Sequence, residues 1–442
     1  MAAQADVDWQ QRALDAEAEV ERFRKRNREL GDELDLLAVA NADLRAMAAP
    51  AAPAPAPAGP PLESFAALRV HGASRALRSE PDSIVHQASG TANATCVAVH
   101  PMGRGLVCGG ADGVVRLFVD GVELIQHACA SPLLRLAFSP EEGSCLACGC
   151  MDGTVRYLCT GELTRGGNPG RPGPDLVLAL KALKKPGGAE AAAAAAASKG
   201  LLRELGRSRD HKSRIVAIAW GESFLGDVGG RQCEMQYFAT CARDKTVIIY
   251  DAQYYSEGGR KLHTLVLPSN PESLCFAPDG KELIVYCRGE PFRRHIDCSR
   301  PDAETRISLN ANDWDTHCSF AVLDMAVSPD GNYLACATDA NKHIIYPLHG
   351  NEHVRVLVGH SADEYANARI AWLSDASVVS NSQKDPGLYQ WDIGSGKILT
   401  HIERAHTKAV RDLAIADDGA ERRLATCSFD KKAKQWGLVM SL

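Results

Sequence analysis

Short apolar runs separated by polar turns recur through most of the 442-residue chain. Each copy has an apolar run, a tight turn with an aspartate and a second run that ends in a bulky residue. Four copies align without gaps, at 106–118, 146–158, 238–250 and 424–436. Their turn aspartates are Asp112, Asp152, Asp244 and Asp430. Runs of this length between turn residues predict pairs of buried β-strands.

The spacing of these copies predicts a repeat protein. Asp112 and Asp152 are 40 residues apart, and the 186 residues from Asp244 to Asp430 accommodate four units of about 46. The 92 residues between Asp152 and Asp244 leave one unit with about 50 extra residues. We expect a surface insertion at about 160–209, because this stretch is rich in Gly, Pro and Ala.

The N-terminal segment has a different period. Apolar side chains recur every seven residues between 8 and 46, which predicts a coiled-coil dimerisation helix. The predicted contacts at its two core positions are Phe23, Leu30, Leu37 and Leu44, and Asn27, Leu34 and Asn41. Buried Asn favours a parallel, in-register homodimer; the alternative is a single amphipathic helix that folds back on the rest of the chain. An Ala/Pro linker, 47–64, separates this helix from 65–442.

Two neighbouring repeats carry the residues of a known motif. These are Gly359-His360 with Trp391-Asp392, followed by His406, Thr426, Asp430 and Trp436. With units of about 40 to 45 residues, they resemble the repeats of WD-repeat β-propellers. The resemblance covers about residues 83–437 and implies an all-β, seven-bladed WD-repeat β-propeller within 65–442. It also implies that each His, Ser/Thr, Asp and Trp set forms a buried hydrogen-bonded chain inside its blade, so that these residues are structural.

The predicted repeats begin near Cys96, Leu136, Ile218, Leu274, Met325, Ile370 and Leu413. The pattern departs from the family where Phe118, Tyr250 and Tyr346 replace Trp, and the irregular fourth to sixth repeats leave eight blades as an alternative. An open ring would expose the edges of its first and last sheets. We therefore expect "SIVH", residues 83–86, to complete the last blade.

Composition limits the classes of partner and the compartment. A formal charge of -6 and a pI near 6.2 give no attraction to nucleic acid or anionic membranes. The 15 cysteines lie mostly within apolar runs, as expected of buried thiols in a reducing compartment. No signal peptide or 18-residue apolar run is present in the sequence, so we expect a cytoplasmic or nuclear protein.

The sequence offers few candidates for catalysis or ligand binding. Cys145, Cys148 and Cys150 have spacings that zinc sites use, but in a strand Cys145 and Cys148 point to opposite faces, which favours buried thiols. The catalytic and phosphate-binding motifs G-x-S-x-G, G-x-x-x-x-G-K-[ST] and H-E-x-x-H are absent from the sequence. The basic run 22–28 occupies the solvated face of the predicted helix, so nucleic-acid binding is not expected. We therefore expect no enzyme, metal or cofactor.

Four charged residues share one position near the start of otherwise apolar strands: Arg135, Asp324, Arg369 and Asp412. They either dock a partner at the rim of the central channel or pair with one another. Together with the predicted dimer, the sequence indicates a protein-interaction scaffold that binds other proteins. The alternative is a substrate-recognition component of a ubiquitin ligase, although the Trp-Asp-x-Arg typical of cullin receptors reads Trp391-Asp392-Ile393-Gly394 here.

Overall fold

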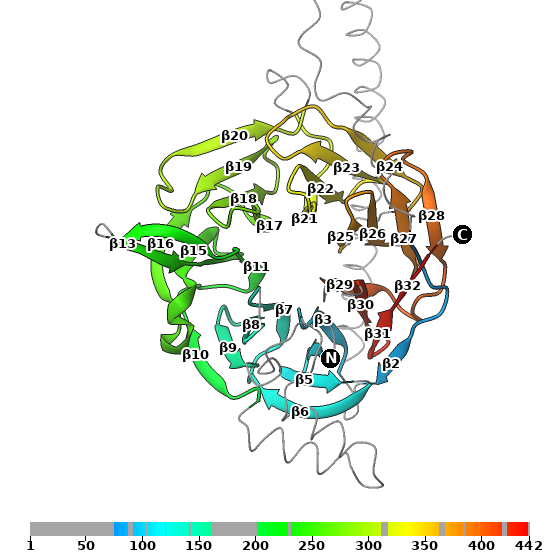
Figure 1. Ribbon diagram of the computed structural model, residues 1–442, viewed down its shortest axis with the longest axis horizontal. Coiled ribbons are helices and arrows are strands. Elements are labelled where there is room, and N and C mark those ends of the chain that lie inside the picture. Colours follow the sequence, from blue (N-terminus) through cyan, green and yellow to red (C-terminus); the bar gives the residue numbers. More distant parts are fainter. Residues whose placement is uncertain are drawn as a thin grey trace, which may run out of the picture. The chain divides into compact units, whose positions relative to one another are not determined.

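Seven four-stranded antiparallel sheets surround a central channel (Figure 1). The computed structural model describes residues 75–86, 92–101, 105–119, 121–140, 143–160, 201–228, 231–310, 317–361, 367–382, 385–417 and 422–440. The predicted dimerisation helix, with its seven contact residues, and the Ala/Pro linker lie outside these ranges. The sheets confirm an all-β, seven-bladed propeller and exclude the alternative of eight blades for the ring described.

We number the blades in chain order, each from its innermost strand outward. Blade 1 consists of β3 (Ala94–Val99), β4 (Gly105–Gly110), β5 (Val114–Val119) and β6 (Val122–Ala128). Blade 2 consists of β7 (Leu133–Phe138), β8 (Cys145–Cys150), β9 (Val155–Cys159) and β10 (Glu204–Ser208). Blade 3 consists of β11 (Ile215–Trp220), β14 (Tyr237–Ala242), β15 (Thr246–Asp251) and β16 (Arg260–Val266). Blade 4 consists of β17 (Pro271–Phe276), β18 (Glu282–Cys287), β19 (Phe292–Asp297) and β20 (Glu304–Ser308). Blade 5 consists of β21 (Val322–Val327), β22 (Tyr333–Thr338), β23 (Lys342–Pro347) and β24 (Arg355–Val358). Blade 6 consists of β25 (Ile370–Ser374), β26 (Ser377–Asn381), β27 (Leu388–Asp392) and β28 (Ile398–Ile402). All seven predicted repeat starts lie on the innermost strands.

Blade 7 joins the two ends of the repeat region. It combines β29 (Val410–Asp417), β30 (Arg422–Ser428) and β31 (Lys432–Trp436) with β2 (Ser83–His86) as its outermost strand. Ser83 pairs with Gln435 and His86 with Lys432, which confirms the predicted closure. A second contact was not predicted: β1 (Arg75–Leu77) pairs with β32 (Leu438–Met440) in a separate two-stranded sheet.

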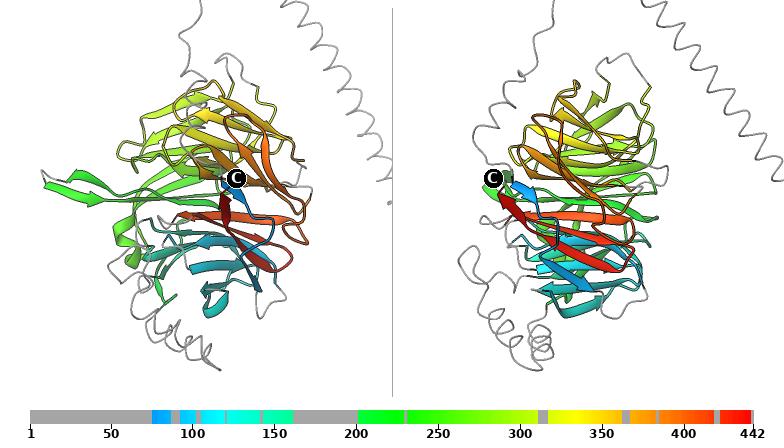
Figure 2. Two further views of the ribbon diagram at one scale, coloured as in Figure 1. Left: turned by 45° about the vertical axis from the view of Figure 1, so that its right-hand side comes forward. Right: turned by 90° about the vertical axis from the view of Figure 1, so that its right-hand side faces the viewer.

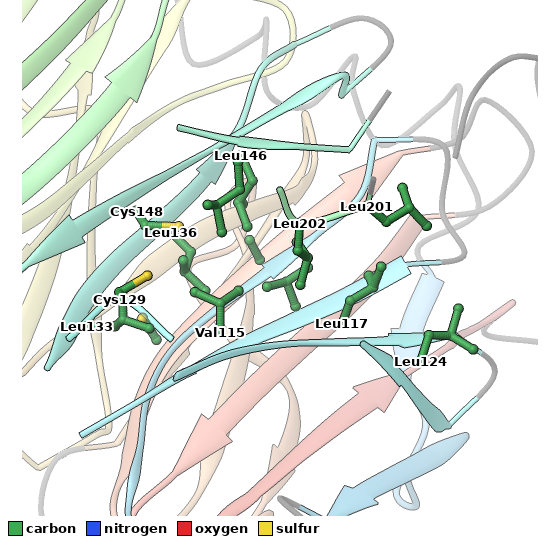
Figure 3. Packing of buried hydrophobic residues seen from close by; sticks show 14 of the residues in the cluster. Val115, Leu117, Leu124, Cys129, Leu133, Leu136, Leu146, Cys148, Leu201 and Leu202 are labelled. Atoms are coloured by element: carbon green, nitrogen blue, oxygen red, sulfur yellow. The ribbon is translucent and has the colours of Figure 1, made fainter. Parts of the chain in front are cut away.

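The core lies between blades, because adjacent sheets pack face to face. The second strands are buried along their whole length in blades 1 to 3, 5 and 6, and small residues such as Ala147 and Cys148 let the neighbouring sheets approach closely. Figure 3 shows one such core between blades 1 and 2, where Val115 and Leu117 lie near Leu136 and Leu146. Burial of each such side chain contributes roughly 2 kcal/mol, so the contacts between blades stabilise the ring.

Two additions depart from a plain repeat. In blade 3 a hairpin of β12 (Phe224–Val228) and β13 (Arg231–Met235) is inserted between β11 and β14 and extends away from the ring (Figures 1 and 2). In blade 2, β10 lies inside the stretch assigned to the insertion at 160–209, because Glu204–Ser208 pairs with β9 as the outermost strand. The extra residues of that blade therefore end before Glu204. A short 3-10 helix, η2 (Ala252–Glu257), follows β15.

Strand alternation places the connections on two opposite faces. The turns from first to second and from third to fourth strand share one face with the β12–β13 hairpin, which we name the hairpin face. The turns from second to third strand, including Asp112, Asp152, Asp244 and Asp430, lie on the opposite, aspartate face.

Candidate functional site

Blade 7 contains the buried polar chain that the resemblance implies. The His406 Nε2 lies 2.9 Å from the Thr426 hydroxyl, and Trp436 Nε1 donates to that same hydroxyl at 2.9 Å. His406 Nδ1 lies 3.0 Å from Asp430 Oδ2. Burial raises the pKa of Asp430, but hydrogen bonds from His406 and backbone N–H groups outweigh it and lower the pKa to about 2. The carboxylate therefore stays ionised, and these four groups are occupied within the blade.

Blade 3 has a related chain that the sequence analysis missed. His211 Nε2 lies 2.7 Å from the Thr240 hydroxyl, and its Nδ1 lies 3.3 Å from Asp244. The histidine precedes its threonine by 29 residues here but by 20 in blade 7, because the β12–β13 hairpin is inserted between them. Tyr250 takes the place of Trp and donates to Asp210 at 3.1 Å. Allowing for an inserted hairpin would have revealed His211 in the sequence.

Blade 6 departs from the implied chain. The Ser380 hydroxyl lies 2.9 Å from Nε2 of His343, which comes from β23 of blade 5. His360, the expected partner, instead stacks on His343 with ring centroids 3.9 Å apart. The expectation that every such histidine bonds the hydroxyl of its own blade is therefore wrong for His360.

Blades 1 and 2 use their turn aspartates locally. Asp112 accepts from the Val114 N–H at 3.1 Å and from Arg116 Nη2 at 2.7 Å. Asp152 accepts from the Thr154 N–H at 3.0 Å and from its hydroxyl at 2.6 Å. Both carboxylates therefore stabilise the tight turn between the second and third strands.

Three of the four charged residues on the inner strands pair across blades. Arg369 of blade 6 lies between two carboxylates, with Nη1 3.2 Å from Asp324 Oδ1 of blade 5 and Nε 3.1 Å from Asp412 Oδ1 of blade 7. Only 4% of Arg369 is exposed. Burial raises the pKa of Asp412, and the charge of Arg369 acts against this rise.

The same position also links adjacent inner strands through the backbone. Asp412 accepts the Val97 N–H of blade 1 at 3.2 Å, and Asp324 accepts the Ile370 N–H of blade 6 at 3.2 Å. Ser273 in blade 4 accepts the Met325 N–H of blade 5 at 3.1 Å. In each case an inward side chain satisfies an amide of the next blade, which positions the strands around the channel.

Arg135 is the fourth residue of this set. Its Nη1 donates to the Leu134 carbonyl at 2.7 Å. Burial, together with the nearby charge of Arg369, lowers its pKa to about 10. The geometry thus brings Asp324, Arg369 and Asp412 into one ion-paired group, to which Arg135 is electrostatically coupled.

A groove on the hairpin face was not predicted. Three parts of the chain form it: the β12–β13 hairpin, the turns of blade 4 and the turns of blade 5, with a volume of about 890 Å³. Phe224, Met235 and Tyr237 give it an apolar wall. We name it the hairpin groove. Its residues are distant in sequence, and only the excess of chain between β11 and β14 could have indicated it.

A possible metal cluster lies in this groove. Glu282, His295 and His349 each place a ligand atom within 4.8 Å of the others. However, Arg293 Nε donates to His295 Nε2 at 3.1 Å, so Nε2 must accept and Nδ1 must carry the proton. That proton is donated to Glu282 Oε1, 3.0 Å away. His295 has no lone pair left for a metal ion, so these residues do not fit a metal site.

Arg293 also fixes the end of the groove. Its Nη2 donates to the carbonyls of Pro347 at 3.1 Å, Leu348 at 3.2 Å and Gly350 at 2.7 Å. Its guanidinium lies 5.1 Å from the centroid of the Tyr346 ring. One buried arginine of blade 4 thus holds the blade 5 turn that carries His349.

Most cysteines of the described ranges are buried thiols that fill the core, and Cys233 is exposed. All 15 are free, and Cys145, Cys148 and Cys150 are fully buried in β8. Burial raises the pKa of Cys108 and of Cys241 to about 12, which keeps both thiols protonated.

Comparisons with known proteins agree with this architecture. The family model of the WD domain, G-beta repeat, matches residues 83–118, 311–345 and 396–437. Transducin beta-like protein 2 from Mus musculus is 22% identical over 210 residues, covering 46% of this chain and 46% of that protein. DDB1- and CUL4-associated factor 13 from Danio rerio is 21% identical over 194 residues, covering 42% and 39%.

A third relative matches a shorter region more closely. WD repeat-containing protein 1-B from Xenopus laevis is 34% identical over 119 residues, covering 26% of this chain and 18% of that protein. The chain thus spans less than half the length of each of these relatives. Among solved structures, a chain of a mitotic checkpoint complex superposes with a TM-score of 0.56 and 15% identity, covering 88% of this chain and 98% of that chain. At this identity the likeness shows the fold.

Proposed function

Because the chain carries WD40 repeats folded into a seven-bladed β-propeller, we propose that it is a non-catalytic scaffold that binds other proteins through the faces of the ring. The observation that supports this most is how the polar groups are used. His406, Thr426 and Asp430 bond within blade 7, and Arg369 pairs with Asp324 and Asp412 across blades. These groups build the ring, so its turns and the hairpin groove are the surfaces on which partners dock.

The N-terminal region supplies the second part of the proposal. We expect residues 8–46 to dimerise as a parallel coiled coil, with 47–64 as a spacer. Two propellers on one dimer gain avidity for a partner with two sites, because the second contact becomes intramolecular. The 15 free cysteines favour a reducing compartment, so the proposed location is the cytoplasm or the nucleus. Within the described ranges, no helix has the length and hydrophobicity needed to cross a bilayer.

Proximity labelling with the full chain tests the scaffold. The expected result is a recurrent group of proteins that also co-purify with the chain in fixed proportions. A fusion of residues 65–442 should retain them at lower yield, because the dimer is lost. A labelled set that matches an unrelated control fusion would contradict the proposal.

A ubiquitin-ligase substrate receptor is the second candidate. It is supported by the similarity to DDB1- and CUL4-associated factor 13. In this chain Gly394 stands where the receptor motif has Arg. An arginine of the neighbouring blade contacts this position instead, because Arg355 of blade 5 donates to the carbonyls of Ile393 at 2.9 Å and Gly394 at 2.6 Å. If cullin adaptors co-purify in equal amounts with the chain, this candidate replaces the scaffold; a stable assembly without them favours the scaffold.

A further inference from the structure

The hairpin groove has one apolar wall because of the register of β12 and β13. Phe224 pairs with Met235, and Gly226 pairs with Cys233, so these four residues share one face of the hairpin. Phe224, Gly226 and Met235 line the groove. Leu225 and Glu234 form the neighbouring pair and lie on the other face, where 69% of Leu225 is exposed. One face of the hairpin therefore lines the groove and the other does not, so variants on the second face serve as controls for variants on the first.

Blades 4 and 5 supply acidic side chains to the lining of the groove. Its lining includes the carboxylates of Asp279, Glu282, Asp297 and Asp330 and the ammonium group of Lys281. Three of these carboxylates hold turns: Asp279 accepts the Lys281 N–H, Asp297 accepts the Ser299 N–H, and Asp330 accepts the Asn332 N–H. The second oxygen of Asp297 lies 3.5 Å from Arg300 Nη2, and that of Asp330 accepts from Asn332 Nδ2 at 2.8 Å. Because turn bonding fixes these carboxylates in place, little side-chain entropy is lost when a cation binds them.

The lysine of the groove shows where a cation fits. Lys281 Nζ lies 4.9 Å from the centroid of the Phe224 ring, so an ammonium group already rests on the aromatic wall. Such a contact is worth about 0.5–1 kcal/mol at an exposed site. An arginine or lysine from a partner would find the same ring, with the carboxylates of blades 4 and 5 in the same groove.

We propose that the hairpin groove binds a basic peptide segment of another protein, with an apolar or aromatic side chain of that segment placed against Phe224 and Met235. The proposal rests on the scaffold function and specifies the chemistry of one partner. A volume of about 890 Å³ accommodates a few side chains. Nucleic acids and anionic membranes do not fit, because their phosphates would face Asp279, Glu282, Asp297 and Asp330.

Fluorescence anisotropy with three labelled peptides tests this on the full chain. The first has four lysine or arginine residues around a central Leu-Trp pair, the second has Ala-Ala at the centre, and the third has glutamate in place of every basic residue. The first should bind, the second should bind about tenfold more weakly, and the third should not bind. Raising the salt concentration from 50 to 300 mM should weaken the first complex several-fold.

Variants on the two faces of the hairpin show whether the peptide binds in the hairpin groove. Phe224→Ala and the double variant Asp297→Asn/Asp330→Asn should each weaken binding about tenfold; Asn retains the oxygen that holds the turn. The controls on the other hairpin face, Leu225→Ala and Glu234→Gln, should leave affinity within twofold. Lys281→Met should raise affinity about threefold, because the competing internal cation is removed. Thermal unfolding of each variant checks that the ring stays folded.

Three results overturn the proposal: no binding of the first peptide at 100 μM, equal losses from variants on both hairpin faces, or tighter binding of the acidic peptide. These outcomes differ from failure of the scaffold itself. If Phe224→Ala and Asp297→Asn/Asp330→Asn keep all proteins that co-purify with the wild-type chain, the scaffold stands and its partners use another surface.

Discussion

The imidazole rings of His343 and His360 stack almost parallel, 3.9 Å apart between centroids and 18° between planes. Both lie edge-on to Trp391, with centroid distances of 5.5 and 5.8 Å. His343 is fully buried and His360 is 4% exposed. Blades 5 and 6 are thus joined through two buried rings, and two imidazolium ions at this distance would repel each other.

This pair predicts a loss of stability in mild acid. Burial lowers the pKa of His360 from 6.5 to about 4, against the opposing charge of Asp385, and burial lowers the pKa of His343 well below 6.5. Below pH 6.5 the unfolded state therefore binds more protons, and the free energy of unfolding falls as the pH falls towards 4. His360 alone accounts for about 2 kcal/mol between pH 7 and pH 5. Urea unfolding at both pH values measures this.

The variant His360→Phe separates this effect from other histidines, such as His100, whose pKa burial also lowers to about 4. Phe keeps an aromatic ring but cannot be protonated, so the loss between pH 7 and pH 5 should shrink by about 2 kcal/mol. The exposed His353 serves as the control, and His353→Gln should keep the wild-type pH dependence. Equal pH dependence of all three proteins would contradict the assignment to His360.

Thr426→Val tests the polar chain of blade 7. Val has nearly the shape of Thr but leaves His406 Nε2 and Trp436 Nε1 without their shared partner. Each unsatisfied buried group costs about 1–3 kcal/mol, so unfolding free energy should fall by about 2–4 kcal/mol. The exposed Thr264 on β16 is the matched position, where Thr264→Val should change stability by less than about 0.5 kcal/mol. Equal effects at both positions would show that the chain of blade 7 contributes nothing.

Arg369 is predicted to stabilise the folded ring chiefly by compensating the buried charges of Asp324 and Asp412. Arg369→Met removes the arginine that pairs directly with both Asp324 and Asp412 and should cost about 3–5 kcal/mol. Adding Asp324→Asn and Asp412→Asn removes these charges and keeps oxygens for the Ile370 and Val97 N–H groups. The triple variant should therefore be more stable than Arg369→Met by at least about 1 kcal/mol. A triple variant less stable than the single one would contradict this account.

Closure of the ring can be tested by two nested deletions. Removal of residues 1–74 spares β1 and β2, so the melting temperature should be unchanged. Removal of 1–90 takes away both strands and exposes the edge of β31, and it should lower the melting temperature by several degrees at least. If both deletions melt like the full chain, blade 7 does not depend on β2.

Features with local signals could be predicted from the sequence. The seven inner strands and the closing strand at Ser83–His86 each show an apolar run next to a recognisable turn. Features that depend on a neighbouring blade could not. Nothing in the sequence places His343 beside Ser380, 37 residues away in another sheet, and the hairpin groove needs three blades to be in place. The pairing of Arg369 with two carboxylates was one of two open alternatives, because equal strand positions do not reveal side-chain direction.

Blade 7 also determines when the native state can be reached during biosynthesis. Its outer strand, Ser83–His86, is translated before the other strands of the ring, whereas its partner Lys432–Trp436 is translated only after the six other blades. Until then the nascent chain carries an unpaired strand at one end and incomplete sheets at the other, both prone to aggregation. The ring therefore closes only after all of its repeats have been translated, and holdase chaperones have that whole interval in which to act.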